Sequence, residues 1–61
     1  MASYAFIQKE SNVETKRLCA TDTSTLRLRS GAIKAPAAIV VGDYIMASGY
    51  VLRVDEVVTA S

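Results

Sequence analysis

The residues best suited to contact a charged partner are the two arginines of the segment Leu26-Arg27-Leu28-Arg29. This alternation is typical of an antiparallel strand with one buried face and one solvated face, with both leucines pointing inward. The two guanidinium groups would then lie about 7 Å apart, because two residues of strand rise separate them. That distance is comparable to the spacing of phosphates along a nucleic-acid strand. It is equally expected of any solvated strand face that carries two arginines.

Nucleophilic and metal chemistry are difficult to assemble from this sequence. The chain has no histidine and one cysteine, Cys19. A Ser-His or Cys-His dyad and an internal disulfide are therefore excluded. One cysteine without histidine is also a poor start for a structural zinc site. Because Cys19 lies between Leu18 and Ala20, we expect it to be a small buried hydrophobic residue.

The carboxylates and glycines do not form a recognisable catalytic motif either. Asp55 and Glu56 are adjacent, so in a strand they face opposite sides and cannot share a proton. Asp43 follows Gly42, a context in which Asp accepts hydrogen bonds from the backbone amides of a turn. The glycines are too widely spaced for a phosphate-binding loop. We therefore expect no enzymatic activity, no cofactor, no metal and no small-molecule substrate.

Length and composition favour a single small domain that needs a partner. The chain has 61 residues, and 51% of them are apolar. A chain of this size buries only about 60% of the surface that it exposes when unfolded. Without disulfides or a metal, association with other chains is the remaining aid to stability. We expect one β domain spanning residues 1–61, with some apolar surface left for a protein interface.

The charges are unevenly distributed along the chain. Residues 1–35 carry six basic and three acidic groups, whereas residues 36–61 carry one basic and three acidic groups. Such asymmetry can make one face basic or let copies stack head to tail. The uncharged stretch from Ala35 to Gly42 has eight residues and is too short to cross a bilayer. The first residues show no basic, apolar signal-peptide pattern, so we expect no membrane partner and a cytoplasmic location in the producing cell.

Abundant Val, Ile, Thr and Tyr with frequent turn residues predict an all-β fold. We expect a small antiparallel sheet, or a partly open barrel of about five or six strands that neighbouring chains could complete. Phe6 should fill the core, and Tyr4 should share its strand face. Pro36 should keep its segment out of a central ladder, although strand character could return at 38–40. The predicted strands are Tyr4 to Lys9, Glu14 to Ala20, Thr25 to Arg29, Tyr44 to Ala47 and Tyr50 to Val58.

The last two predicted strands should form a hairpin around Ser48-Gly49. A two-residue loop would pair Ala47 with Tyr50, Met46 with Val51, Ile45 with Leu52, and Tyr44 with Arg53. One face is then apolar and belongs to the core, because it carries Ile45, Ala47, Tyr50, Leu52 and Val54. The other face is mixed, and on it Tyr44 could lie against the stem of Arg53.

The segment VVGDYIMASGYVLRVDEVV, from Val40 to Val58, resembles the hairpin of small SH3-like β-barrels. In these barrels a Gly-Asp turn leads into a short strand, a tight turn and a longer alternating strand. Similar hairpins occur in small phage structural proteins of the head, neck and tail, and in nucleic-acid-binding barrels. The resemblance covers about a third of the chain and implies no particular functional residue.

Two functions fit the sequence best. The first is a non-catalytic structural or interaction subunit that forms a homo-oligomer or docks onto a larger assembly, for example as a component of a phage virion. Its candidate interface residues are Ala35, Pro36, Ala37, Ala38, Ile39, Val40 and Val41. The second is a nucleic-acid-binding module, whose candidate phosphate contacts are Lys16, Arg17, Arg27 and Arg29, with Lys9 and Lys34 as further candidates. A small inhibitor that docks on an enzyme would present a surface similar to that of the first.

Overall fold

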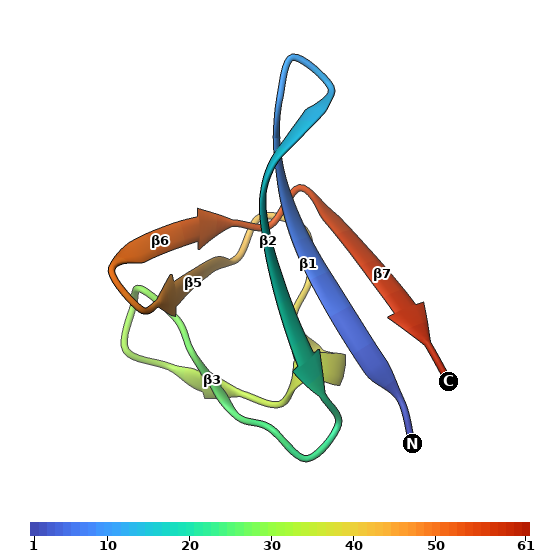
Figure 1. Cartoon of the computed structure of the whole chain (residues 1–61). Coiled ribbons are helices and arrows are strands. Elements are labelled where there is room, and N and C mark those ends of the chain that lie inside the picture. The colour runs from blue at the N-terminus through green and yellow to red at the C-terminus, as the bar shows by residue number, and fades with distance from the viewer.

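A computed structural model describes all 61 residues and shows an all-β chain with one short 3-10 turn (Figure 1). The strands pair antiparallel in three small sheets that do not close into a barrel. The predicted fold class is therefore confirmed. The elements are β1 (Ser3–Glu10), β2 (Val13–Thr21), β3 (Leu26–Arg27), β4 (Ile33–Lys34), the 3-10 turn η1 (Pro36–Ala38), β5 (Tyr44–Ala47), β6 (Tyr50–Arg53) and β7 (Glu56–Ala60).

The first layer is a three-stranded sheet in the order β2-β1-β7. Its long β1–β2 hairpin extends beyond the other strands (Figure 1). Ser11 and Asn12 form the turn, with φ of 53° and 67°, which is the backbone signature of a type I′ turn. A bulge follows, because the register shifts between Gln8 and Lys9 and leaves Thr15 without a pair. The Thr15 hydroxyl donates to the Gln8 carbonyl at 3.2 Å.

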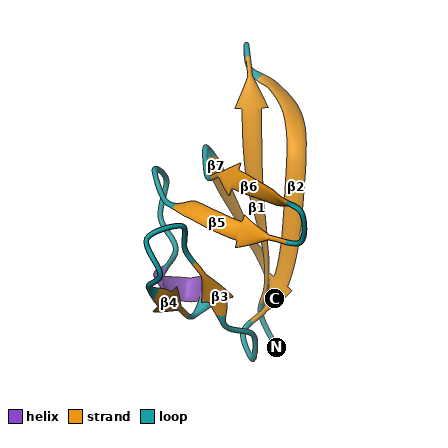
Figure 2. Cartoon of the chain, turned by 90° about the vertical axis from the view of Figure 1, so that its left-hand side faces the viewer, coloured by secondary structure: helices purple, strands orange, loops and turns teal.

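The second layer consists of two short hairpins, β3–β4 and β5–β6, that lie against one face of the first sheet (Figure 2). A single bridge, Leu28 to Ile45, aligns β3 with β5. Beside it the Arg29 amide donates to the Tyr44 carbonyl at 2.8 Å. The two hairpins therefore behave as one curved layer, although only one bridge joins them.

The core lies between the two layers. Its buried members are Phe6, Leu28, Ile39, Ile45, Leu52 and Val54, and Tyr4, Leu18, Ala20, Leu26 and Val57 pack against them partly buried. Phe6 is fully buried, as predicted. Its ring lies parallel to that of Tyr4 on the same strand face, with centroids 6.3 Å apart. The opposite face of the three-stranded sheet has no layer over it.

The register predicted for the β5–β6 hairpin is confirmed at all four pairs. Ile45, Leu52 and Val54 are fully buried, so the face assigned to the core is also correct for these residues. Tyr50 differs, because it stands at the end of the hairpin and is exposed. The ammonium of Lys16 lies 5.5 Å from the centroid of its ring.

Three predicted strand boundaries are wrong. The strand expected at 25–29 is regular only over β3, since the chain then bends into a turn at 29–31. Strand character does not return at 38–40, because Pro36 begins the 3-10 turn η1, a position that suits its fixed φ. The strand expected at 50–58 breaks at Val54-Asp55, and its second half leaves β5 to pair with β1 as β7.

Candidate functional site

The outer face of the second layer carries two arginines together with exposed and partly buried apolar side chains. The Leu28–Ile45 bridge turns both of these residues into the core. Alternation then directs their chain neighbours outward. We call this surface the β3–β6 face, and its members are Arg27, Arg29, Ile33, Tyr44, Met46 and Val51. Figure 2 looks toward these strands.

One cross-strand row on this face is largely apolar. Arg27 lies opposite Ile33 in the β3–β4 register, and Met46 lies opposite Val51 in β5–β6. The bridge makes Arg27 and Met46 neighbours. Ile33 is 63% exposed and Met46 is 45% exposed, so the row presents apolar atoms to solvent around one guanidinium.

The next row joins Arg29, Tyr44 and Arg53 across β3, β5 and β6. The Arg29 guanidinium lies over the Tyr44 ring, 4.0 Å from its centroid, which is a cation–π arrangement. Tyr44 was expected to lie against the Arg53 stem, and the two residues are cross-strand partners. A hollow of about 180 Å³ adjoins Arg29 and Tyr44. That volume is below the range of pockets that enclose small molecules.

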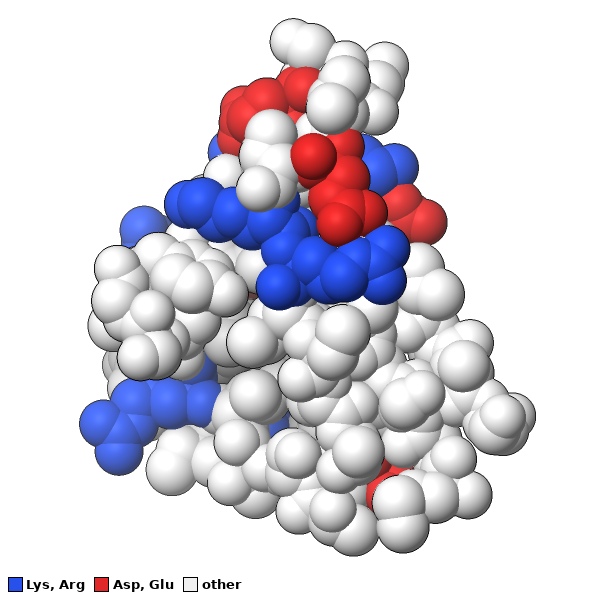
Figure 3. Space-filling model, viewed as in Figure 1, with Lys and Arg blue, Asp and Glu red and all other residues white.

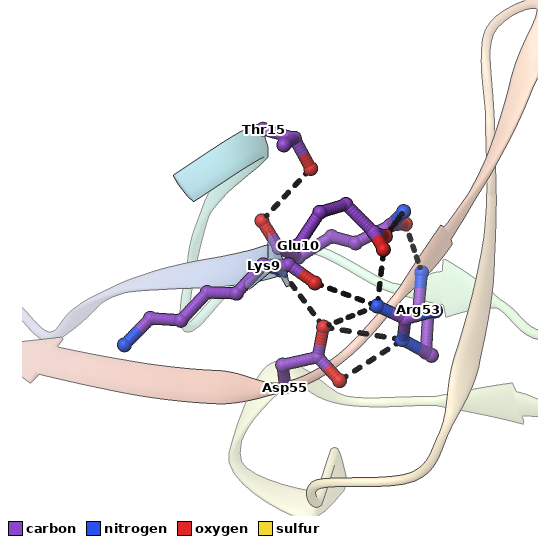
Figure 4. Close-up of polar contacts among 6 residues, drawn as sticks. Lys9, Glu10, Thr15, Arg53 and Asp55 are labelled. Carbon is purple, nitrogen blue, oxygen red and sulfur yellow. Dashed lines mark hydrogen bonds and ion pairs between the residues drawn. The ribbon is translucent and has the colours of Figure 1, made fainter. Parts of the chain in front are cut away.

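Arg53 is not available to a partner, because it is tied to the end of β1 (Figure 4). Its guanidinium donates to both Asp55 oxygens at 3.0–3.1 Å, to Glu10 at 2.9 Å and to the Lys9 carbonyl at 2.7 Å. Its amide donates to the Gln8 side chain at 2.9 Å. The Lys9 amide in turn donates to Asp55 at 2.8 Å. This cluster fixes the β6–β7 corner against the first sheet.

The pKa values in this cluster follow from its hydrogen bonds. The hydrogen bonds from the Arg53 guanidinium lower the pKa of Asp55, and the bond from the Lys9 amide lowers it further. Gln8 and then Arg53 lower the pKa of Glu10. Asp55 and Glu10 raise the pKa of Arg53 in return. All three groups are therefore held in their charged forms.

The four predicted phosphate contacts do not share one surface. Arg27 and Arg29 lie together on the β3–β6 face and have no carboxylate partner. Arg17 pairs with Glu14 through two bonds of 3.0 Å. Lys16 is on the other face of β2, over Tyr50. The further candidates are also paired, Lys9 with Glu56 at 2.6 Å and Lys34 with Asp43 at 3.1 Å.

The segment predicted as an apolar interface is divided between core and surface. Pro36 and Ile39 are buried within the chain. The exposed remainder is Ala35, Ala37, Ala38, Val40 and Val41. Asp43 accepts from the Val40 amide at 3.0 Å, which confirms its predicted role in a turn. This bond and the ion pair with Lys34 lower the pKa of Asp43.

The prediction that Cys19 is buried is wrong, because its side chain is exposed. Cys19 pairs with Ala5 on the open face of the first sheet. Its chain neighbours Leu18 and Ala20 are the residues that contact the core. The exposure of Cys19 could have been predicted from the alternation of β2, because adjacent residues of a strand face opposite sides of the sheet.

Ile33 is the site residue that sequence reasoning missed. The mixed face of the β5–β6 hairpin was predicted with Tyr44, Met46 and Val51 on it. Ile33 joins them only through the β3–β4 pairing, which is two residues long.

No helix is long enough to cross a membrane, since the one helical segment is η1. No cluster of three or more Cys, Asp or Glu side chains is positioned to hold a metal ion.

No protein-family model, curated protein or solved structure matches this chain at a significant level. The resemblance of Val40 to Val58 to SH3-like hairpins therefore stays a prediction.

Proposed function

We propose that this protein is a non-catalytic interaction subunit that docks onto a partner protein through the β3–β6 face. The observation that carries the proposal is the cross-strand row in which exposed Ile33 and Met46 flank Arg27, a cation without a carboxylate partner. Apolar side chains beside Arg and Tyr are the composition of the centre of a protein interface. The complementary surface would be apolar, with carboxylates placed opposite Arg27 and Arg29.

Such a small subunit is best suited to be a component of a larger assembly. The resemblance of Val40 to Val58 to hairpins of phage structural proteins makes a virion component the concrete instance. The protein would then reside in the cytoplasm of the producing cell before assembly and in the particle afterwards.

The test is to follow incorporation of the tagged chain into complexes in the organism that encodes it. Replacing Arg27→Glu together with Met46→Asp should remove the chain from the complex, because a carboxylate partner would meet like charge and the apolar contact would be lost. Lys16→Glu with Val13→Asp makes matched changes on β2 and should leave incorporation intact. Circular dichroism must show that both double variants fold. Loss of incorporation in both, or in neither, would contradict the proposal.

A second candidate function, nucleic-acid binding, rests on one specific observation. Arg27 and Arg29 are two cations without a carboxylate partner, and they lie together on the β3–β6 face, where they could contact phosphates. The aromatic ring beside them, Tyr44, is already covered by Arg29 and offers little stacking area to a base. This geometry favours a protein partner.

Fluorescence anisotropy with a labelled single-stranded oligonucleotide separates the two functions. Nucleic-acid binding predicts an affinity that falls steeply between 50 and 200 mM salt, roughly in proportion to the phosphates contacted. It also predicts a loss of affinity in the Arg27→Ala, Arg29→Ala double variant. Docking on a protein predicts no oligonucleotide binding at physiological salt.

A further inference from the structure

Strand β7 forms an open edge of the three-stranded sheet. It pairs with β1 on one side and with no strand on the other, and in Figure 1 it forms the right-hand margin of the molecule. Its sequence, Glu-Val-Val-Thr-Ala, contains no proline, glycine or lysine. Natural proteins usually protect exposed edges with proline or with charged residues, especially lysine, with bulges or with inward-pointing charges. Apart from Glu56 at its first position, this edge lacks these devices.

The opposite edge of the same sheet is protected. Strand β2 carries Glu14, Lys16 and Arg17 in its first half, next to the bulge at Thr15. The two edges therefore differ in their ability to accept another strand. A pairing partner should join at β7 and not at β2.

On the open face of the sheet, the row of Arg17, Ile7 and Glu56 is charged, but the part of this face beyond that row, toward the chain termini, is uncharged. Two cross-strand rows occupy it, one of Cys19, Ala5 and Val58 and the other of Thr21, Ser3 and Ala60. Viewed onto this face, the charged side chains gather toward the β1–β2 turn, and the surface over β7 and the lower parts of β1 and β2 is almost free of charge (Figure 3). Small uncharged side chains let two sheets continue into one another without like charges meeting.

We propose that β7 pairs antiparallel with β7 of a second copy of this chain, giving a dimer with a continuous six-stranded sheet. A two-fold axis at Val58 places Val58 against its own copy, Val57 against Thr59, and Glu56 against Ala60. The only charge on the strand, Glu56, meets alanine and is already paired with Lys9. The edge is therefore self-complementary, as a two-fold interface requires. This contact is separate from the β3–β6 face and does not depend on the proposed function.

Sedimentation over a wide concentration range tests the proposal. The mass should rise from the 6.5 kDa of one chain toward twice that value as concentration increases. Val58→Lys should hold the mass at one chain, because two lysines would face each other at the axis. Mixing Val58→Lys with Val58→Glu should restore the dimer. The matched control Val13→Lys, on the protected β2 edge, should dimerise like the original chain.

Disulfide trapping gives a second measurement that does not depend on tolerance of a charge. In a Cys19→Ser background, Val58→Cys should cross-link rapidly under oxidising conditions, because directly opposed residues of antiparallel strands have Cα atoms about 4.5–5.5 Å apart. Val13→Cys in the same background should cross-link far more slowly. A constant mass of one chain at every concentration would overturn the proposal, as would equal cross-linking at the two positions.

Discussion

At the scale of single residues, Arg53 has the largest structural role of any charged side chain. It stands at the end of β6 and binds Asp55, two residues along the chain, together with Glu10 and the Lys9 carbonyl at the end of β1 (Figure 4). Both layers meet at this point. Arg17 is a useful contrast, because its two bonds go to Glu14 of the same strand and join no other element.

We predict that Arg53→Met lowers the urea midpoint at pH 7 more than Arg17→Met does. The Arg53 contribution should depend on pH, because it lowers the folded-state pKa of Asp55 and Glu10. A lowered carboxylate pKa stabilises the fold fully above the unfolded values, about 3.9 and 4.3. This stability is lost as the pH falls through the lowered folded values. The difference in midpoint between the original chain and Arg53→Met should therefore shrink in acid, where the bond to the Lys9 carbonyl remains but the two carboxylates lose their charge. A constant difference across pH would contradict this role.

At the scale of elements, the β1–β2 turn is the clearest case of a backbone conformation that one of its residues, Ser11, does not favour. A type I′ turn needs positive φ at both central positions. Ser11 and Asn12 adopt it with φ of 53° and 67°, although serine resists this region. We predict that replacing the pair with Asn-Gly raises the free energy of unfolding by about 1 kcal/mol. Urea denaturation followed by circular dichroism measures the change, and an unchanged or lower midpoint would mean that the turn is not type I′ in solution.

Elements with strong local signals were predictable, and those set by distant contacts were not. Alternation around Ser48-Gly49 was sufficient for the β5–β6 register and for the outward direction of Met46. By contrast, β7 separates from β6 because Asp55 turns to bind Arg53 and Lys9, residues contributed by different strands. The Ile33 part of the candidate site depends on a two-residue pairing that no periodic pattern can reveal.

At the scale of the whole molecule, a single small core holds the two layers together. Six buried side chains form this core. The first sheet contributes one of them, Phe6 of β1, which is fully buried. A domain of this size rarely has more than about 3–5 kcal/mol of stability. Truncation of one core side chain should therefore remove most of the free energy of unfolding of the isolated chain. The proposed pairing of β7 between copies would add stability that grows with protein concentration.

The substitution Leu52→Ala tests how much of the stability comes from the small core. Leu52 is fully buried between the layers, so its truncation should cost about 2–5 kcal/mol and leave the dilute chain largely unfolded at 25 °C. Met46→Ala, on the exposed face of the same hairpin, should change stability by only about 0.5 kcal/mol or less. Urea denaturation at several protein concentrations measures both. A midpoint that rises with concentration in the original chain would show that association contributes to folding. If Leu52→Ala and Met46→Ala had equal midpoints, the small core would not be what holds this fold together.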